Sequence, residues 1–218
     1  MNEIIFIDKP KGITSFGAVS RVRRVLSEKA GKKVKVGHTG TLDPFATGLL
    51  ILMAGQATKR CSEFMKLDKE YIAEIRLGET STTGDPEGIV QKSYTGEPVA
   101  EGVIKKVVQE FIGEIEQTVP AFSAVRIKGQ RAYDLARKGI KVEMPTRKVH
   151  IYNIEILDYD WPILKIRTSV SSGTYIRALG EDIGKKLGTG AYLTSLRRTK
   201  IDKYSVDEAT PLEEFEKM

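Results

Sequence analysis

One loop of this sequence holds the residues best suited to chemistry. Residues 37–48 read Gly-His-Thr-Gly-Thr-Leu-Asp-Pro-Phe-Ala-Thr-Gly, with a single carboxylate, Asp43, and a single imidazole, His38. Glycine adopts backbone angles closed to other residues, and proline fixes its own angle and biases the preceding residue away from the helical region. Such a loop can hold a carboxylate for nucleophilic or electrostatic work. In the alternative, Asp43 bonds its own backbone in a surface turn, and the spacing alone leaves both open.

The common catalytic motifs are absent from the sequence. It contains no Gly-x4-Gly-Lys-Ser/Thr loop, no Gly-x-Ser-x-Gly elbow, no His-Glu-x-x-His pair and no Gly-x-Gly-x-x-Gly turn. Two His and one Cys cannot supply the usual ligands of a zinc site, and a carboxylate-only Mg²⁺ site has no signature here. His150 lies in a strand pattern and is expected to be structural. The protein therefore works with carboxylate, arginine and tyrosine, or does no chemistry.

Length and composition are those of a soluble globular protein. The 218 residues allow one large domain or two small ones, with 40% hydrophobic and 29% charged residues. The longest apolar run, Leu49–Ala54, is too short to span a bilayer, and Asp8 and Lys9 interrupt any signal-peptide core. The single cysteine, Cys61, fits a reducing cytoplasm.

The net charge of +6 is unevenly distributed along the chain. Residues 1–60 carry +7 and residues 126–150 carry +6, whereas the intervening residues 61–125 carry −6. Two basic blocks around an acidic one suggest a surface with one face suited to a polyanion such as nucleic acid. The alternative is a set of solvated charges without a partner.

The elements that must position the loop are mixed in type. Strands are predicted over residues 3–7, 49–54, 71–77, 148–157 and 163–170. Helices are predicted from an N-cap at Ser15 to about residue 31, and over residues 57–66, 103–112, 131–138 and 175–187. The first helix should bury Phe16, Val19, Val22, Val25 and Leu26. Residues 80–88 read as a polar loop, Lys128-Gly129 as a turn, and the last dozen residues as a capping helix. Strands and helices without regular βαβ alternation favour an α+β fold.

Several motifs, in the same order along residues 4–210, resemble those of the TruB family of tRNA pseudouridine synthases. Five motifs in register make the resemblance specific. The first is Asp8-Lys9-Pro10-Lys11-Gly12 with Thr14-Ser15, and the second is residues 37–44 with 46–48. The third is Lys69-Glu70-Tyr71 with Leu77-Gly78 and 82–85, and the fourth is residues 119–124 with Lys128-Gly129 and Ala132-Tyr133. The fifth is residues 172–177 with Leu179, followed by residues 193–197.

The resemblance implies a mixed, largely antiparallel sheet with flanking helices and a central active-site cleft. It implies a single pseudouridine synthase catalytic domain over residues 1–218, acting on the T stem-loop of tRNA and producing pseudouridine at position 55. The family uses no metal and no cofactor. Many bacterial relatives carry a C-terminal RNA-binding PUA domain, for which a chain ending at Met218 leaves no room. We further expect a cytoplasmic monomer without a membrane or protein partner.

The resemblance assigns three catalytic residues. Asp43 is the nucleophile on a flipped-out uridine, and whether it attacks the base or the ribose stays open. Arg177 pairs with Asp43 and keeps it charged; the alternative is a phosphate-binding or helix-surface arginine. Tyr71 stacks on the uracil with its hydroxyl near the base for proton removal; the alternative is one more inward strand aromatic.

Five further residues are assigned to substrate binding. His38 fills the space left by the target base or stacks on RNA, unless it is a loop histidine bonded to backbone. Tyr175 and Leu196 line the uracil pocket, although core packing explains Leu196 almost as well. Lys9 shapes the cleft wall more than it touches substrate. Asp85 orients the active-site network, unless it is a solvated loop acid.

Phosphate contacts are expected from Arg21, Arg23, Arg24 and residues 126–148. A catalytically silent RNA-binding or RNA-folding module on the same scaffold is the main rival. A retaining glycosidase needs two close acids, and the loop supplies one.

Overall fold

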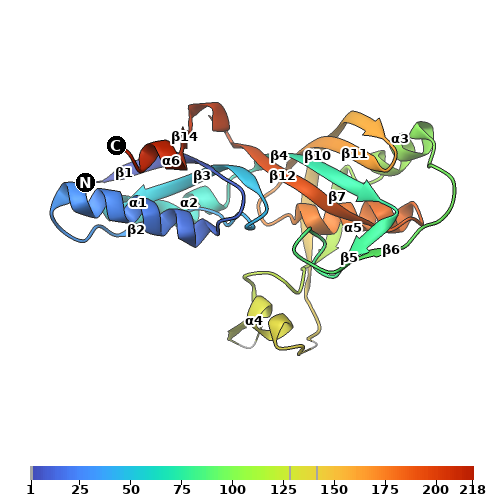
Figure 1. Cartoon of the computed structure of the whole chain (residues 1–218), viewed down its shortest axis with the longest axis horizontal. Coiled ribbons are helices and arrows are strands. Elements are labelled where there is room, and N and C mark those ends of the chain that lie inside the picture. The colour runs from blue at the N-terminus through green and yellow to red at the C-terminus, as the bar shows by residue number, and fades with distance from the viewer. Residues whose placement is uncertain (1, 128, 141) are drawn as a thin grey trace. The chain divides into compact units, whose positions relative to one another are not determined.

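The computed structural model describes residues 2–127, 129–140 and 142–218 (Figure 1). Lys128 of the turn expected at Lys128-Gly129 therefore lies outside the described residues, as does Lys141 of the second basic block. The chain divides into two compact units. Unit 1 comprises Met1–Ile72 and Ser195–Met218, and unit 2 comprises Ala73–Thr194. Strands β4 (Lys69–Leu77) and β12 (Ala191–Ile201) contribute residues to both units.

In unit 1 the strands follow the order β14-β1-β3-β12-β4, with β2 also on β3 and β13 on β12. Strands β1 and β2 pair with β3 in antiparallel fashion, whereas β12 pairs with the first residues of β3 in parallel. The chain leaves β2 at one end of β3 and re-enters at the other, which creates the loop that carries Asp43. These strands are β1 (Glu3–Lys9), β2 (Val36–His38), β3 (Thr47–Ala54), β13 (Tyr204–Ser205) and β14 (Thr210–Pro211).

Strand β3 is buried on both faces and forms the centre of unit 1. Its alternate residues Leu50, Leu52 and Ala54 face a cluster that includes the apolar side of helix α1 (Ser15–Ala30). Leu49, Ile51 and Met53 face a second cluster that includes Phe64, Ile201 and Val206. A strand that is covered on both faces reads as a continuous apolar run, and this is why Leu49–Ala54 was recognisable in the sequence.

Helix α1 confirms the predicted end and the predicted burial of Val19, Val22, Val25 and Leu26, but it corrects the start and the placement of Phe16. Thr14, not Ser15, is the N-cap, and its hydroxyl accepts a hydrogen bond from the Gly17 amide at 2.9 Å. Phe16 is 64% exposed, so its placement in the core was wrong. The buried stripe is centred on Ser15, Ala18 and Val22, and one residue step from Ser15 turns the side chain by about 100° to the outside. The helix ends at Gly31, whose left-handed φ of 61° closes the C-cap.

The remaining helical segments of unit 1 are shorter than predicted. The helix expected over residues 57–66 is a 3₁₀ segment, Gly55–Arg60, followed by α2 (Cys61–Met65). The expected C-terminal helix is reduced to α6 (Leu212–Phe215), preceded by the 3₁₀ turn Val206–Glu208. Gly55, with a φ of 64°, interrupts regular structure between β3 and the 3₁₀ segment.

In unit 2 the strand order continues as β12-β4-β11-β10-β7. The predicted pair of strands is confirmed as β10 (Thr146–Asp160) and β11 (Ile163–Val170), which pair in antiparallel fashion, and β10 also pairs with β7 (Gly113–Thr118). Helix α5 (Ile176–Lys186) buries one face, including Ile176, Leu179 and Ile183. The architecture is α+β, a mostly antiparallel sheet with flanking helices.

Smaller elements complete unit 2. The polar loop expected at residues 80–88 begins as strand β5 (Glu79–Ser81), which pairs with β6 (Val90–Lys92). Helices α3 (Glu101–Gln109) and α4 (Ala132–Arg137) are each shorter than predicted. Strands β8 (Arg126–Ile127) and β9 (Gln130–Arg131) form a hairpin before α4, and α4 projects from the rest of unit 2 (Figure 1).

Candidate active site

The loop that carries Asp43 is fastened to helix α1 and to β3. Ser15 bonds Leu42 twice: the Leu42 amide donates to the Ser15 hydroxyl at 2.7 Å, and that hydroxyl donates to the Leu42 carbonyl at 2.9 Å. The Ala46 amide donates to the Asp43 carbonyl at 3.1 Å, which closes a turn around Pro44. Asp43 itself is half-buried. The residues on both sides of the carboxylate are therefore fixed by the surrounding structure.

A buried lysine holds the loop just after Asp43. Lys9 is fully buried, and its amino group donates to the carbonyl oxygens of Pro10 at 2.9 Å, Ile13 at 2.8 Å and Pro44 at 3.4 Å. These contacts favour a part in shaping the wall around Asp43 over direct contact with substrate.

A buried arginine holds the two ends of the same loop. Arg198 donates from Nε to the Leu49 carbonyl at 2.8 Å, from Nη2 to Gly40 at 3.1 Å and from Nη1 to Thr41 at 3.4 Å. Gly48 lies against the backbone of this arginine, where an added Cβ would come within 2.2 Å of the Arg198 carbonyl oxygen. Only glycine fits there, and its φ of 103° also requires glycine.

His38 ends β2 and begins the loop. Its Nδ1 accepts a hydrogen bond from the Gly40 amide at 3.3 Å, so the imidazole is used as an acceptor. Burial lowers the pKa of His38, and the positive charge of Arg198 lowers it further. His38 is therefore a neutral, half-buried ring bonded to its own loop, and its part in RNA binding stays a prediction.

Tyr71 and Leu196 belong to the strands that close unit 1. Tyr71 lies on β4 and is 8% exposed, and Ala73 and Ile75 on the same strand are buried in the predicted alternation. Leu196 on β12 is 6% exposed. Each side chain is mostly covered yet reaches the surface, and their contact with a uracil stays a prediction.

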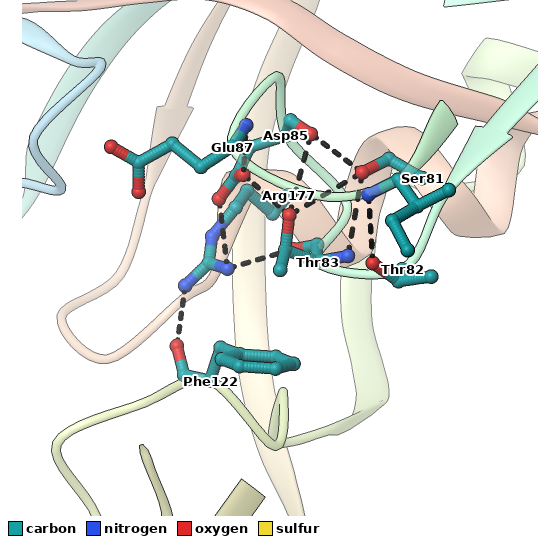
Figure 2. Close-up of polar contacts among 8 residues, drawn as sticks. Ser81, Thr82, Thr83, Asp85, Glu87, Phe122 and Arg177 are labelled. Atoms are coloured by element: carbon teal, nitrogen blue, oxygen red, sulfur yellow. Dashed lines mark hydrogen bonds and ion pairs between the residues drawn. The ribbon is translucent and has the colours of Figure 1, made fainter. Parts of the chain in front are cut away.

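Arg177 and Asp85 form a buried network in unit 2 (Figure 2). Arg177 Nη1 lies 3.1 Å from Asp85 Oδ2, with the two side chains 5% and 4% exposed. The guanidinium also donates to the carbonyls of Thr83 and Phe122, each at 2.8 Å. The two alternatives, a helix-surface arginine and a solvated loop acid, are therefore excluded. Pairing of Arg177 with Asp43 stays a prediction.

The loop that presents Asp85 is itself tightly bonded. Asp85 Oδ1 accepts from the Thr83 hydroxyl at 2.6 Å and from the Glu87 amide at 3.0 Å, and the Ser81 hydroxyl donates to the Asp85 carbonyl at 2.6 Å (Figure 2). Glu181 of α5 packs against this loop, where a Cβ on Gly84 would lie 2.9 Å from its Oε1. Burial raises the pKa of Glu181, and the positive charge of Arg177 opposes that shift.

Tyr175 precedes α5 and is held by a buried amide. The Tyr175 amide donates to Gln117 Oε1 at 2.7 Å, and Gln117 Nε2 donates to the Tyr175 carbonyl at 3.0 Å. Gln117 is fully buried on β7. The Arg147 guanidinium lies 5.4 Å from the centre of the Tyr175 ring. This arrangement fixes the start of the helix that carries Arg177.

The sequence prediction missed Arg198 and Gln117 as supports of the site, although each left a signal. Arg198 is two residues after the buried Leu196, so strand alternation places it inward. Gln117 likewise shares a strand face with Ile115. The contacts of Arg177 with the Thr83 and Phe122 carbonyls could not be predicted, because every residue has a backbone oxygen.

The basic side chains expected to bind phosphate differ in their surroundings. Arg21 and Arg24 both pair with Glu216, at 3.2 and 3.0 Å, and Arg23 contacts the Ser20 hydroxyl at 3.5 Å. By contrast, four lysines line a pocket of about 490 Å³ in unit 1, and in the described part of the chain none of the four has a carboxylate partner. They are Lys32, Lys33, Lys35 and Lys59.

A second basic pocket lies in unit 2, within the block of residues 126–148. It has a volume of about 680 Å³ and lies beside α4. Its charged lining residues are Arg126, Arg137 and Lys138, with Asp134 as the acid. Phosphate binding there stays a prediction, and Lys128 and Lys141 of the block lie outside the described residues.

Neither a metal-ligand cluster nor a membrane-spanning helix is present among the described residues. No three His, Cys, Asp or Glu side chains gather there as a metal site would require. None of the helices in the described ranges is both long and apolar enough to cross a membrane.

Two family models match the sequence and together cover most of it. The model described as TruB family pseudouridylate synthase (N terminal domain) matches residues 23–176. The model described as tRNA pseudouridylate synthase B C-terminal domain matches residues 177–218.

Curated proteins similar to this chain are named tRNA pseudouridine synthase B. The protein of Parabacteroides distasonis is 46% identical over 215 residues, which cover 98% of this chain and 92% of that protein. The Aquifex aeolicus protein is 48% identical over 218 residues, covering 99% of this chain and 74% of its own length. The Desulfotalea psychrophila protein is 50% identical over 213 residues, covering 94% and 84%.

Solved structures with a similar fold belong to larger chains. A crystal structure of a Cbf5-Nop10-Gar1 complex matches with a TM-score of 0.74 and 32% identity, over 96% of this chain and 52% of that one. An H/ACA RNP bound to a substrate RNA containing 2'-deoxyuridine matches with a TM-score of 0.71 and 29% identity. This chain therefore spans about half the length of these solved chains.

Proposed function

The chain belongs to the TruB family of pseudouridylate synthases, and we propose that it isomerises uridine to pseudouridine at position 55 in the T loop of tRNA. One observation carries this proposal. The sequence keeps Asp43, Tyr71 and Arg177 in family motifs, and its relatives named tRNA pseudouridine synthase B align over nearly the whole chain. We expect the enzyme to act as a monomer in the cytoplasm, as one catalytic domain over residues 1–218, without metal or cofactor.

The reaction requires three changes in the nucleotide. The bond between ribose C1' and uracil N1 breaks, the base turns, and C1' joins uracil C5. The C5 proton is then lost and N1 gains a proton, so atoms and charge balance without an oxidant or reductant. We propose that the Asp43 carboxylate is the nucleophile, and attack on the base or on the ribose would both use it in the ionised form.

Arg177 is proposed to orient the Asp43 carboxylate and keep it charged. The support lies in how strongly the guanidinium is held. Asp85 and the carbonyls of Thr83 and Phe122 occupy it from two sides, and the residue is buried on α5. A guanidinium fixed in this way has one set orientation, which suits planar recognition of a carboxylate.

Three residues are proposed to hold the flipped base, and a fourth to contact the RNA that it leaves. Tyr71 stacks on the uracil, and its hydroxyl takes part in removing the C5 proton. Tyr175 and Leu196 line the pocket. His38, neutral because its pKa is lowered, fills the space that the base leaves or stacks on RNA. A neutral ring suits stacking, since it carries no charge that must be desolvated.

The RNA backbone is proposed to contact the basic surfaces. Extracting a base from a folded loop costs a few kcal/mol, which contacts to phosphates must offset. The four pocket lysines of unit 1, which have no carboxylate partner in the described ranges, and the basic residues around α4 supply such contacts. Arg21 and Arg24 are less suited, because both already pair with Glu216, whose carboxylate offsets one of their two charges.

The test is conversion of a defined substrate. A tRNA transcript with uridine at position 55 is incubated with the purified protein, digested, and mapped for pseudouridine by mass spectrometry. A transcript with cytidine at position 55 is the matched control. We expect one pseudouridine per uridine-55 transcript and none in the control.

Three results would contradict the proposal. Binding of tRNA without conversion would identify a silent RNA-binding module. Release of free uracil would identify an N-glycosidase. Conversion of the cytidine-55 transcript at another uridine would show that the target position is wrong.

A further inference from the structure

Arg198 is a buried cation that has no role in the reaction proposed above. It is 1% exposed and lies on β12, among the largest fully buried side chains of the described residues. Removing a guanidinium from water costs several kcal/mol unless the protein replaces its hydration. The contacts that replace this hydration therefore indicate the role of Arg198.

Those contacts are all carbonyl oxygens, and they lie on the two sides of one loop. Gly40 and Thr41 precede Asp43, and Leu49 follows the loop into β3; each accepts a hydrogen bond from Arg198. Among the described residues Arg198 forms no ion pair with a carboxylate. One planar guanidinium thus joins the two ends of the loop that carries Asp43, as five donors in a rigid fork allow.

The backbone of Arg198 is fixed as tightly as its guanidinium. Arg198 pairs with Gly48 in the parallel register of β12 and β3. The backbones approach so closely that a Cβ on Gly48 would lie 2.2 Å from the Arg198 carbonyl oxygen and 2.8 Å from its nitrogen. Since neither the backbone nor the guanidinium can shift alone, the loop is clamped to β12.

The positive charge of Arg198 acts on the groups around it. It lowers the pKa of His38, after the larger effect of burial. It also lowers the pKa of Lys69 on β4, again after burial, to about 8, while Asp68 opposes the shift. A charge that disfavours neighbouring cations favours a neighbouring carboxylate in its ionised form.

We propose that Arg198 is a positioning residue of the reaction, which clamps the Asp43 loop to β12 and places a positive charge beside it. This inference rests on the proposed role of Asp43. Arg198 touches neither substrate nor the reacting atoms in this scheme. Its effect is on where the carboxylate lies and on its charge, so it should alter turnover and leave RNA affinity unchanged.

The experiment compares Arg198→Met, Arg198→Lys and the neighbouring Arg197→Met. Arg197 is the matched control, because it points to the opposite side of the strand and pairs with Asp8 at 2.7 Å. We expect Arg198→Met to lower kcat at least thirtyfold while the tRNA Kd changes less than threefold. Arg198→Lys keeps the charge without the fork and should recover part of the loss. Arg197→Met should keep kcat within threefold of the parent.

A second readout does not depend on activity. The chain has two histidines, so their ring signals can be followed by NMR as pH is varied. In Arg198→Met the pKa of His38 should rise, whereas the signals of His150 should not differ from those of the parent. In Arg198→Lys the amides of Thr39 and Leu42 should exchange faster with solvent than in Arg197→Met, because one clamp of the loop is loosened.

The outcomes separate this inference from the proposed function. If Arg198→Met does not fold, Arg198→Lys decides: parental kcat with parental amide exchange overturns the inference. A loss of affinity that matches the loss of kcat also overturns it, since Arg198 would then act on RNA binding. If the parent makes no pseudouridine but the His38 shift and faster exchange are observed, the clamp stands and the proposed function fails.

Discussion

Asp43 can act as a nucleophile only when it is ionised and held in one place. Its neighbours in unit 1 hold the loop that carries it. Asp43→Asn keeps the shape of the side chain and removes its charge. We expect kcat for pseudouridine formation to fall by more than about a thousandfold, as when a catalytic nucleophile is removed. RNA affinity and thermal stability should stay close to the parent. Residual kcat within tenfold of the parent in single-turnover assays would reject Asp43 as the nucleophile.

Arg177 is the second residue whose substitution is informative, because lysine keeps its charge and loses its geometry. Arg177→Lys cannot serve Asp85, Thr83 and Phe122 together with a further carboxylate. We expect a loss of about 2 kcal/mol in transition-state stabilisation, which lowers kcat/KM roughly thirtyfold.

Asp85→Asn is the companion variant for Arg177. It leaves the arginine in place and removes its buried partner, so it should reduce kcat in the same direction. If Arg177→Lys retains parental kcat/KM while its melting temperature falls, the arginine is a structural residue of unit 2 only.

Tyr71 separates stacking from proton transfer. Tyr71→Phe keeps the ring and loses the hydroxyl, so tRNA affinity should be unchanged while kcat falls by about 10²–10⁴-fold, the usual contribution of a general base. Tyr71→Ala should in addition weaken binding by about 1–3 kcal/mol, since stacking on the base is lost. Equilibrium binding and single-turnover rates on the same transcript distinguish the two effects. Full activity of Tyr71→Phe would leave Tyr71 as a stacking surface alone.

At this scale the sequence offered candidates for the chemistry, and their roles stay predictions, but it did not reveal the residues that support them. Asp43 was singled out because glycine and proline mark a structured loop, and Asp85 because its motif resembles one of the family. Arg198 and Gln117 escaped, because a buried polar side chain is identified by its partners and those partners are mostly backbone atoms. Phe16 misled in the opposite direction, since an aromatic residue at the edge of an apolar stripe can face outward.

Among the elements of unit 1, β3 and β12 approach each other closely at Gly48, where a side chain would not fit. Gly48→Ala would force an L side chain into a φ of 103° and place its Cβ 2.2 Å from the Arg198 carbonyl. We expect a loss of at least about 2 kcal/mol in the free energy of unfolding, measured by urea denaturation.

Gly113→Ala is the matched control for Gly48→Ala. Its φ is 112°, yet an added Cβ would meet nothing within 4 Å. The control therefore carries the backbone strain without the clash and should lose less. Equal losses in the two variants would show that the contact between the two strands adds nothing to the strain.

Strands were predictable from the sequence where one face or both faces of the strand are buried. The alternation in Tyr71–Leu77 and the apolar run Leu49–Ala54 both became strands, because each pattern matches one way of covering a strand. Short segments were less predictable. Residues 57–66 divide into a 3₁₀ segment and a five-residue helix, since such lengths are decided by tertiary contacts more than by propensity.

For the whole molecule, the uneven charge is the property most closely tied to substrate. The sequence alone showed two basic blocks, but not which of their charges are already neutralised. In the structure Glu216 pairs with Arg21 and Arg24, whereas the four pocket lysines have no carboxylate partner among the described residues. The distinction depends on a glutamate almost two hundred residues away along the chain, which no local pattern reveals.

The salt dependence of tRNA binding tests whether the pocket lysines contact phosphates. Each phosphate that a cation neutralises adds about 0.7–0.9 to the slope of log K against log salt concentration. Replacing the four pocket lysines by glutamine should therefore weaken tRNA binding and reduce the slope by about 1 for each lysine that contacts a phosphate. The catalytic residues are untouched, so single-turnover rates at saturating enzyme should match the parent. The variant combines substitutions at Lys32, Lys33, Lys35 and Lys59.

A charge-matched control decides whether the effect belongs to the pocket or to net charge. The control replaces Lys105, Lys106, Lys165 and Lys186, three of which already pair with carboxylates in unit 2. Both variants lower the net charge of +6 by the same amount, so a long-range effect of net charge would weaken binding equally in both. Local contact predicts a reduced slope in the pocket variant alone. Equal slopes in parent and pocket variant would place the phosphate contacts on other basic residues, with those around α4 the next to be substituted.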